Sequence, residues 1–148
     1  MPKTPFLAAV FCTALFAAVP AHADEDAPWS EIEVGGVADS DLGQHDVIMM
    51  AIDGSMDFRD RSIYELAPGR HHFRIASTRR GRSGEMTARP FVIEAQPCVR
   101  YALIADHGTG EAAQSWRIAV AEETPIKSCM KKFATRLASD TESASAGP

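Results

Sequence analysis

Short runs of strand-forming residues, separated by turn signals, occupy most of the chain and restrict the folds that it can adopt. In the clearest run, residues 70–77, apolar and polar side chains alternate, as they do in a strand with one buried face. About seven such runs follow one another, roughly ten residues apart: 29–34, 47–52, 63–66, 70–77, 86–94, 98–105 and 116–121. Turn signals such as Asp53-Gly54 and Pro68-Gly69 lie between them. The spacing is typical of an antiparallel sandwich or small barrel, and we predict an all-β fold, an antiparallel β-sandwich.

Two segments differ from this alternation. Residues 47–52 are apolar throughout, and a continuous apolar run of strand length predicts a strand that is buried on both faces. After Pro125, apolar residues recur at helical spacing, so we expect a short C-terminal helix within 126–137. Trp29 and Trp116 are expected to pack in the core between the sheets rather than to serve as ligand platforms.

Residues 1–23 have the order of a secretory signal peptide. Lys3 precedes an uncharged apolar segment, residues 6–19, and the sequence Ala21-His22-Ala23 follows a proline. This order predicts cleavage after Ala23 and a mature protein in the periplasm or outside the cell; the alternative is a buried core helix. The apolar segment is too short for a membrane span, and we expect none.

Composition limits the number of domains and the type of partner. A length of 148 residues and an apolar share of 45% fit one globular domain. We assign this domain to residues 24–137, and the Ser- and Ala-rich segment 138–148 is expected to be a disordered tail. The formal net charge of −5 argues against general nucleic-acid binding, because nucleic-acid-binding surfaces are usually basic.

Two cysteines, Cys98 and Cys129, lie in the predicted mature chain. An even cysteine count in an oxidising compartment favours a disulfide between them. A redox or metal-binding pair has less support, because the two residues are 31 positions apart without a Cys-x-x-Cys motif. The predicted disulfide would tie the C-terminal segment back to the domain.

Residues 47–105 carry a resemblance to a known group of modules. A strand that ends in Ile52-Asp53-Gly54, a corner reading Tyr64-x-Leu66-x-Pro68-Gly69-x-His71, and the strands that follow resemble PEGA-like and transthyretin-like (carboxypeptidase regulatory-like) β-sandwich modules of small secreted bacterial proteins. The resemblance implies a non-enzymatic accessory or envelope-facing domain, and it carries over no functional residues.

Charge is distributed unevenly along the chain. Residues 24–57 contain ten acidic residues and no Lys or Arg, whereas residues 58–105 contain nine arginines and four acidic residues. One interpretation is internal pairing across neighbouring strands, which stabilises little per exposed pair. The other is an anion-binding edge at Arg79, Arg80 and Arg82, whose guanidinium groups suit phosphate or carboxylate. Lipid head groups, cell-wall polymers and acidic proteins are the candidate partners.

The histidines outside the predicted signal peptide are His45, His71, His72 and His107. His71 and His72 are adjacent on a predicted strand, so they point to opposite faces and cannot readily share one metal ion. His45-Asp46 and Asp106-His107 could approach one another from separate loops, but their spacing does not require it. We therefore expect neither a metal site nor a cofactor.

Catalytic signatures are missing from the sequence: it has no G-x-S-x-G elbow, no H-E-x-x-H motif and no glycine-rich nucleotide loop. We expect no enzyme but a secreted, non-catalytic module that binds an envelope protein or anionic polymer through Arg79, Arg80 and Arg82. One alternative is a small periplasmic metal-binding protein or enzyme that uses His45, His71 and His107. Another is a structural subunit that docks through a strand edge.

Overall fold

The computed structural model describes residues 27–81, 83–109 and 115–134. Within them the elements are, in chain order, β1 (Ser30–Val34), the 3-10 helix η1 (Ser40–Leu42), β2 (Gln44–His45), β3 (Val47–Ile52), β4 (Ile63–Leu66), β5 (Gly69–Ser77), β6 (Ala88–Ala95), β7 (Val99–Asp106), β8 (Arg117–Pro125) and a C-terminal helix over 127–134. The predicted signal peptide 1–23, the predicted tail 138–148 and Arg82 lie outside the described residues.

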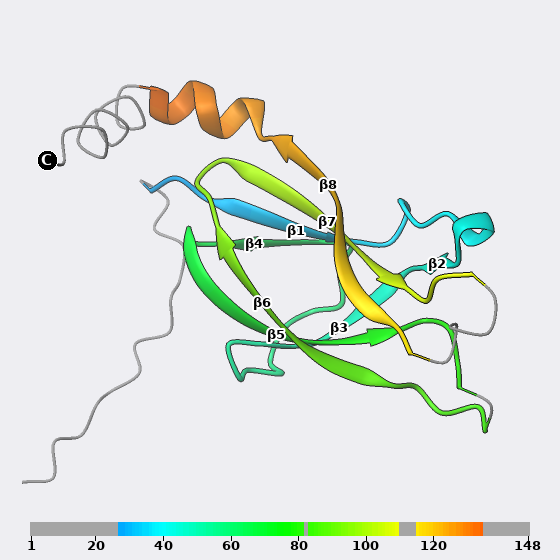
Figure 1. The fold of residues 1–148 in the computed structure, drawn as a ribbon. Helices are drawn as coiled ribbons and strands as arrows, with labels where there is room; N and C mark the ends of the chain where they lie inside the picture. The colour runs from blue at the N-terminus through cyan, green and yellow to red at the C-terminus, as the bar shows by residue number, and fades with distance from the viewer. Residues whose placement is uncertain (1–26, 82, 110–114, 135–148) are drawn as a thin grey trace, which may run out of the picture.

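The strands form two packed sheets, which confirms the predicted all-β sandwich with its short C-terminal helix (Figure 1). Sheet A contains β1, β2, β4, β7 and β8, with β7 paired to β1, β2 and β8; sheet B contains β3, β5 and β6. Each pairing is antiparallel except that of β1 with β7, which is parallel. A parallel pair needs a long crossover, and here the chain between β1 and β7 supplies all of sheet B.

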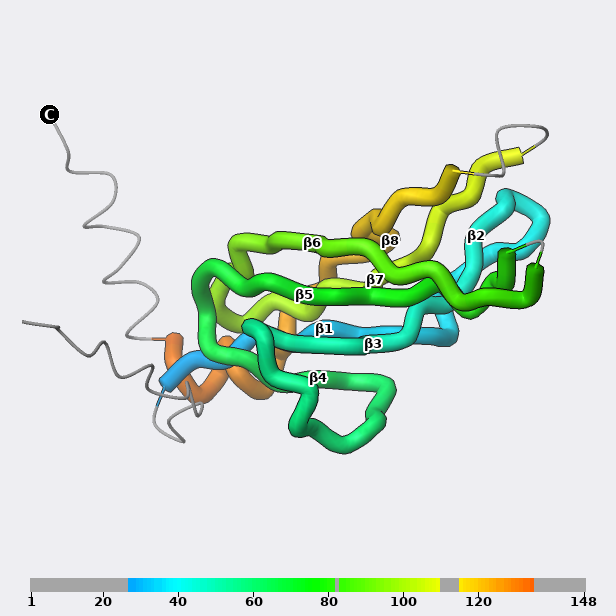
Figure 2. The backbone as a smooth tube through the Cα atoms, turned by 90° about the horizontal axis from the view of Figure 1, so that it is seen from below, coloured from blue at the N-terminus to red at the C-terminus, as the bar shows by residue number. Residues whose placement is uncertain are grey.

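The chain passes from sheet A to sheet B at Asp46, the single residue between β2 and β3. In sheet B, β5 and β6 form a long hairpin whose register runs from Gly69 opposite Ala95 to Ala76 opposite Ala88. The described residues between the two strands form the tip of this hairpin, which extends beyond the sandwich (Figures 1 and 2).

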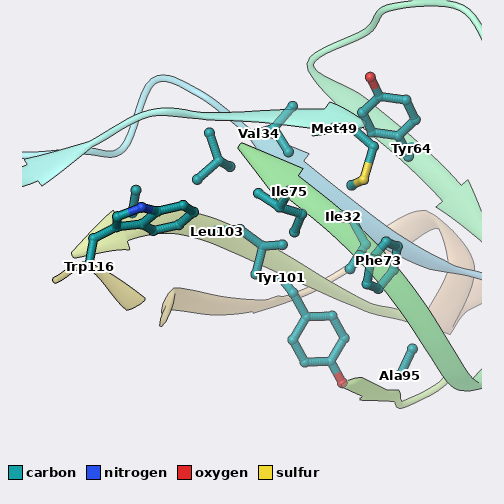
Figure 3. Packing of buried hydrophobic residues seen from close by; sticks show 12 residues of the cluster. Ile32, Val34, Met49, Tyr64, Phe73, Ile75, Ala95, Tyr101, Leu103 and Trp116 are labelled. Carbon is teal, nitrogen blue, oxygen red and sulfur yellow. The ribbon is translucent and has the colours of Figure 1, made fainter. Parts of the chain in front are cut away.

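The core lies between the two sheets, where alternate residues of facing strands meet (Figure 3). Its largest buried members include Ile32, Val34, Met49, Tyr64, Phe73, Ile75, Tyr101, Leu103 and Trp116. Trp116 lies in this core as predicted, and its Nε1 donates a hydrogen bond to Thr87 Oγ1 at 2.7 Å. Tyr101 keeps its polar end at the rim, where its hydroxyl oxygen accepts a hydrogen bond from the backbone N–H of Gln96 at 2.9 Å.

A second, smaller core surrounds the disulfide. Cys98 and Cys129 are bonded and fully buried, so the predicted disulfide is confirmed, and they pack with Ile126 and Phe133. Trp29 belongs to this cluster, with its ring edge-on to Phe133 at 6.1 Å between centroids. The prediction that Trp29 packs between the sheets is therefore wrong, because Trp29 precedes β1 and meets the helix that the disulfide holds in place.

Burial alternates along β3 instead of covering both faces. Val47 and Met49 are buried in the core, whereas Ile48 and Met50 are only half-buried. The prediction that this strand is buried on both faces is wrong, because no described segment packs on the outer face of sheet B (Figure 2). The outward apolar residues of β3 therefore face away from the core without a covering layer in the described chain.

Candidate binding surface on the β5–β6 hairpin

Three of the outward side chains of β5 are basic, and the fourth, Ala76, is buried. Residues His71, Phe73 and Ile75 point into the core, and the residues between them, Arg70, His72 and Arg74, are exposed on the outer face of sheet B. Alternate residues on a strand are separated by about 6.6–6.8 Å, so these three side chains form one line along the strand. We call them the basic stripe.

The hairpin tip continues this basic character beyond the strand. Arg79 and Arg80 are exposed there, and Arg82 lies outside the described residues. The tip is organised by hydrogen bonds: Gly81 N donates to Glu85 O at 2.9 Å, and Arg80 Nη1 donates to Gly84 O at 2.9 Å. At its base Thr78 is bonded through both its backbone N–H and its hydroxyl group to the Asp46 carbonyl oxygen, each at 2.9 Å.

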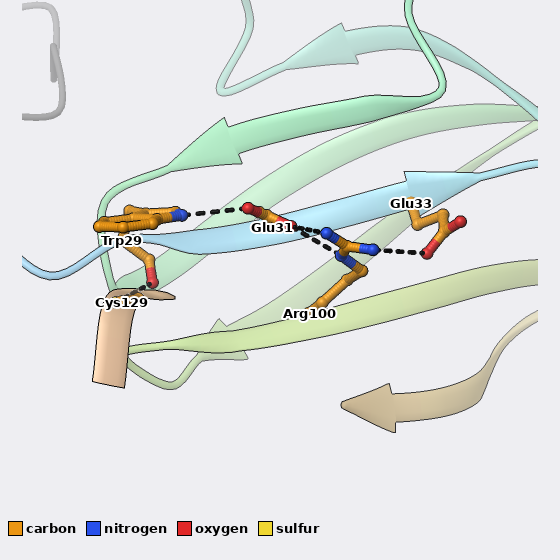
Figure 4. A network of polar contacts seen from close by, with 5 residues as sticks. All are labelled: Trp29, Glu31, Glu33, Arg100 and Cys129. Atoms are coloured by element: carbon orange, nitrogen blue, oxygen red, sulfur yellow. Dashed lines mark hydrogen bonds and ion pairs between the residues drawn. The ribbon is translucent and has the colours of Figure 1, made fainter. Parts of the chain in front are cut away.

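Most arginines of the central region are not paired with acidic residues. Among the described arginines of residues 58–105, Arg100 alone forms ion pairs, with Nη2 at 2.6 Å from Glu31 Oε2 and Nη1 at 3.7 Å from Glu33 Oε2 (Figure 4). Glu31 also accepts a hydrogen bond from Trp29 Nε1 at 3.1 Å. Internal pairing therefore accounts for Arg100 but not for the arginines of the hairpin.

Along the hairpin, positively charged residues outnumber acidic residues. Residues 69–95 contain six arginines and two acidic residues, Glu85 and Glu94. Arg89 lies over the Trp116 ring, with its guanidinium carbon 5.4 Å from the ring centroid, and so helps to cover the core. The side chains of Arg70, Arg74 and Arg79 have no hydrogen bond or ion pair with any described residue.

Asp53 and His71 join the turn after β3 to the corner before β5. His71 Nδ1 lies 2.6 Å from Asp53 Oδ2, and His71 Nε2 lies 2.7 Å from the Ala67 carbonyl oxygen. Both ring nitrogens face oxygen acceptors, so both contacts are donated hydrogen bonds only when the imidazole carries both protons. The other carboxylate oxygen of Asp53 accepts the backbone N–H of His72 at 2.8 Å. This pair fixes the end of β5 from which the basic stripe starts.

The pKa of Asp53 reflects these contacts. Partial burial raises the pKa of this carboxyl, but the hydrogen bonds from the His72 backbone N–H and the His71 ring, together with the charges of both histidines, outweigh that effect and lower it below 3.8. Asp53 also has a left-handed backbone with φ of 49°, a conformation that aspartate tolerates better than most residues. The carboxylate is therefore the stable form in the folded protein.

At the opposite end of β5, Ser77 and His107 form a buried pair. Ser77 Oγ lies 2.8 Å from His107 Nε2, and the two residues are 0% and 6% exposed. The His107 ring stacks on Trp116 and meets the His45 ring edge-on, with centroids at 5.7 and 5.0 Å. In this arrangement the serine oxygen has no access to a substrate, and the cluster closes one end of the core.

The histidines considered for a metal site are only partly brought together. His45 and His107 are adjacent, but His71 lies at the other end of β5. The neighbouring carboxylates have other partners: Asp46 accepts the Gly36 backbone N–H at 3.1 Å, and Asp106 pairs with Arg117 at 2.8 Å, a contact that lowers the pKa of Asp106. In the described part of the chain, no group of three or more His, Cys, Asp or Glu residues is arranged to hold a metal ion.

The sequence pattern predicted binding residues at the hairpin tip, but it did not indicate the basic stripe or the Asp53–His71 pair. The alternation of β5 placed Arg74 on the polar face, yet it could not show that this arginine lacks an acidic neighbour. The signal for the pair was present in the turn residues: an aspartate before Gly54 and a histidine after the Pro68-Gly69 corner.

Comparisons with known proteins add no assignment to this geometry. No protein-family model matches the chain, and no curated protein or solved structure matches it significantly. No helix among the described residues is long and apolar enough to cross a membrane. The functional inference therefore depends on the residues and contacts of the hairpin.

Proposed function

We propose that the protein is exported, loses residues 1–23, and works in the periplasm or outside the cell as a non-catalytic β-sandwich module related to PEGA-like and transthyretin-like domains. Its role is to bind an acidic envelope protein or anionic polymer through Arg79, Arg80 and Arg82 at the tip of the β5–β6 hairpin. The observation that carries this proposal is the absence of acidic partners for the described hairpin arginines, in contrast to the paired Arg100.

Physical chemistry favours a partner rather than an internal role for these side chains. Arg79 has no side-chain partner among the described residues, and Arg80 has only its hydrogen bond to Gly84 O, so neither side chain is engaged by an acidic residue of the described chain. Guanidinium groups bind carboxylates and phosphates through two parallel hydrogen bonds, and several of them on one tip act together on a polyanionic surface. Because such contacts are exposed, added salt would weaken them.

The test compares two variants of equal charge change. One replaces the tip residues, Arg79→Ala, Arg80→Ala and Arg82→Ala; the control replaces three exposed cations elsewhere, Arg59→Ala, Arg61→Ala and Lys131→Ala. Both are expressed in the native organism, and protein, glycan and lipid adducts are quantified after crosslinking in intact cells. We expect the tip variant to lose the adducts that the control retains. Equal adduct yields for the two variants and the wild type would refute the role of the tip.

The second candidate function, a metal-binding protein or enzyme that uses His45, His71 and His107, has one observation in its favour. The rings of His45 and His107 are in contact at one end of the sandwich. Elemental analysis of the purified mature protein, with thermal unfolding in Zn²⁺ and Cu²⁺, tests it: stoichiometric metal or a metal-dependent rise in melting temperature that His45→Ala abolishes would favour it over the binding module.

A further inference from the structure

We propose that the binding surface does not end at the tip but continues along the outer face of sheet B, and that it receives a partner protein whose surface combines carboxylates with apolar side chains. This inference rests on the proposed function of the hairpin and specifies both the extent of the surface and the class of the partner. The surface, called here the B face, consists of the basic stripe together with the residues that flank it, Ile48 and Met50 on β3 and Pro90 and Val92 on β6.

The flanks of the B face are apolar. On β6, Val92 lies opposite His72 and Pro90 lies opposite Arg74, and the Val92 side chain is 44% exposed. On β3, Ile48 lies opposite Ala76 and Ala51 lies opposite Arg74, and Met50 is the extra residue of the bulge between Met49 and Ala51. Arg74 is therefore bordered on both sides by apolar residues, whereas Arg70 lies opposite Glu94 on β6.

The apolar residues of β3 require an explanation that the fold does not provide. An antiparallel sheet with one solvated face alternates between apolar inward residues and polar outward residues. β3 instead has apolar residues at its outward positions, a pattern of strands that are covered on both faces. Since no described segment covers the B face, a second molecule is the layer that this sequence pattern anticipates (Figure 2).

The charged residues of the B face agree with the composition of a protein interface. Interface centres are enriched in Arg and Met and depleted in Lys, Glu and Asp relative to other surface. The outward residues of β3, β5 and β6 include two arginines and one methionine, no lysine, and a single acidic residue, Glu94. No ion pair joins Glu94 to Arg70, its neighbour in register, among the described residues.

The mixture of charges and apolar groups selects a protein over a polymer or a lipid surface. A polyanionic polymer would bind the arginines and leave Ile48, Met50 and Val92 in water. A bilayer would need apolar side chains that reach beyond the cations, whereas an extended arginine reaches further from a sheet than valine or isoleucine. A protein surface can place acidic side chains about 7 Å apart over the stripe and apolar side chains over its flanks.

The test places a photocrosslinking amino acid, p-benzoylphenylalanine, at position 92 on the B face and, as control, at position 65 on sheet A, where Glu65 is exposed. Irradiation of cells that express the full chain, followed by mass spectrometry, identifies the class of molecule and the peptide attached at each position. We expect position 92 to crosslink an acidic peptide of a partner protein, and position 65 not to crosslink that peptide.

Charge reversal then tests recognition. Arg70→Glu with Arg74→Glu should lower the crosslink yield by about tenfold or more, and Lys substitutions at the crosslinked carboxylates of the partner should restore it. If circular dichroism shows that the charge-reversed variant does not fold, the Arg70→Gln, Arg74→Gln double variant replaces it in the test. A lipid or glycan adduct at position 92, equal yields at positions 92 and 65, or no rescue by the partner's Lys substitutions would overturn the inference.

The two proposals fail differently. If the tip variant loses binding while the Arg70 and Arg74 variants and Val92→Ser retain it, the hairpin function stands and the B face is not part of it. If the stripe and Val92 variants lose binding while the tip variant retains it, the B face stands and the tip assignment is wrong. If all variants bind like the wild type, both proposals are refuted.

Discussion

Removing the Cys98–Cys129 disulfide should destabilise the folded protein by an amount that its position in the chain determines. The bond closes a loop with a sequence separation of 31. In the chain-entropy model, opening a loop of this length stabilises the unfolded state by about 3.7 kcal/mol at 25 °C. Both sulfur atoms lie in the small core with Ile126 and Phe133, so the C-terminal helix should separate from the sandwich when the bond is absent.

The assay is urea unfolding of the mature protein with and without a reducing agent, and of the Cys98→Ala, Cys129→Ala double variant. With a slope of about 1.5 kcal/mol per molar urea for a domain of this size, the midpoint should fall by about 2.5 M. Trp29 contacts the helix, and Trp116 lies in the main core. In a Trp116→Phe background Trp29 is the remaining tryptophan, so its fluorescence reports the unfolding of the helix end. A midpoint shift below about 0.5 M would show that the bond does not constrain the unfolded chain as argued.

Three further predictions concern the core, the ion pairs and pH. Leu103→Ala, at a residue with 0% exposure, should cost about 2–5 kcal/mol in urea unfolding, whereas a loss below about 1 kcal/mol would mean that the sheets do not pack there. Arg100→Gln should cost about 1 kcal/mol because it removes the cation paired with Glu31, whose side chain is 13% exposed, while Arg74→Gln should change stability by less than about 0.5 kcal/mol; equal effects would contradict the difference in pairing. Asp53→Asn should destabilise at pH 7 by about 1 kcal/mol, since it removes the negative charge and one of the two acceptor oxygens of a side chain that is 44% exposed. The folded-state pKa of Asp53 is lowered, so its contribution is full above its unfolded value near 3.8 and disappears as the pH falls through the folded value; a difference between wild type and variant that does not shrink as the pH falls below 3.8 would refute this origin.

The strand pattern could be predicted because it depends on local sequence. Alternation with period two defined β5, and turn residues such as Pro68-Gly69 marked its start. The disulfide followed from the cysteine count and the predicted export signal. In contrast, β2 has two residues, Gln44 and His45, too few for any periodic signal, and it exists because the chain crosses between the sheets at Asp46.

Features that depend on which strands become neighbours could not be predicted. The parallel pairing of β1 with β7 joins Glu31 to Arg100, which are far apart in sequence, and this pairing decides which arginine is neutralised. The apolar run of β3 was interpreted as burial on both faces because sequence does not show whether a second layer belongs to the same chain. The candidate surface at Arg70 and Arg74 was missed for the same reason.

The most direct test of a β-sandwich that binds through its hairpin side is hydrogen–deuterium exchange of the purified mature protein, measured with and without a detergent extract of the native envelope. We predict slower exchange in peptides that cover residues 70–92, with unchanged exchange in peptides from β1 and β4. Protection that appears in β1 and β4 while residues 70–92 exchange as in the free protein would contradict the account.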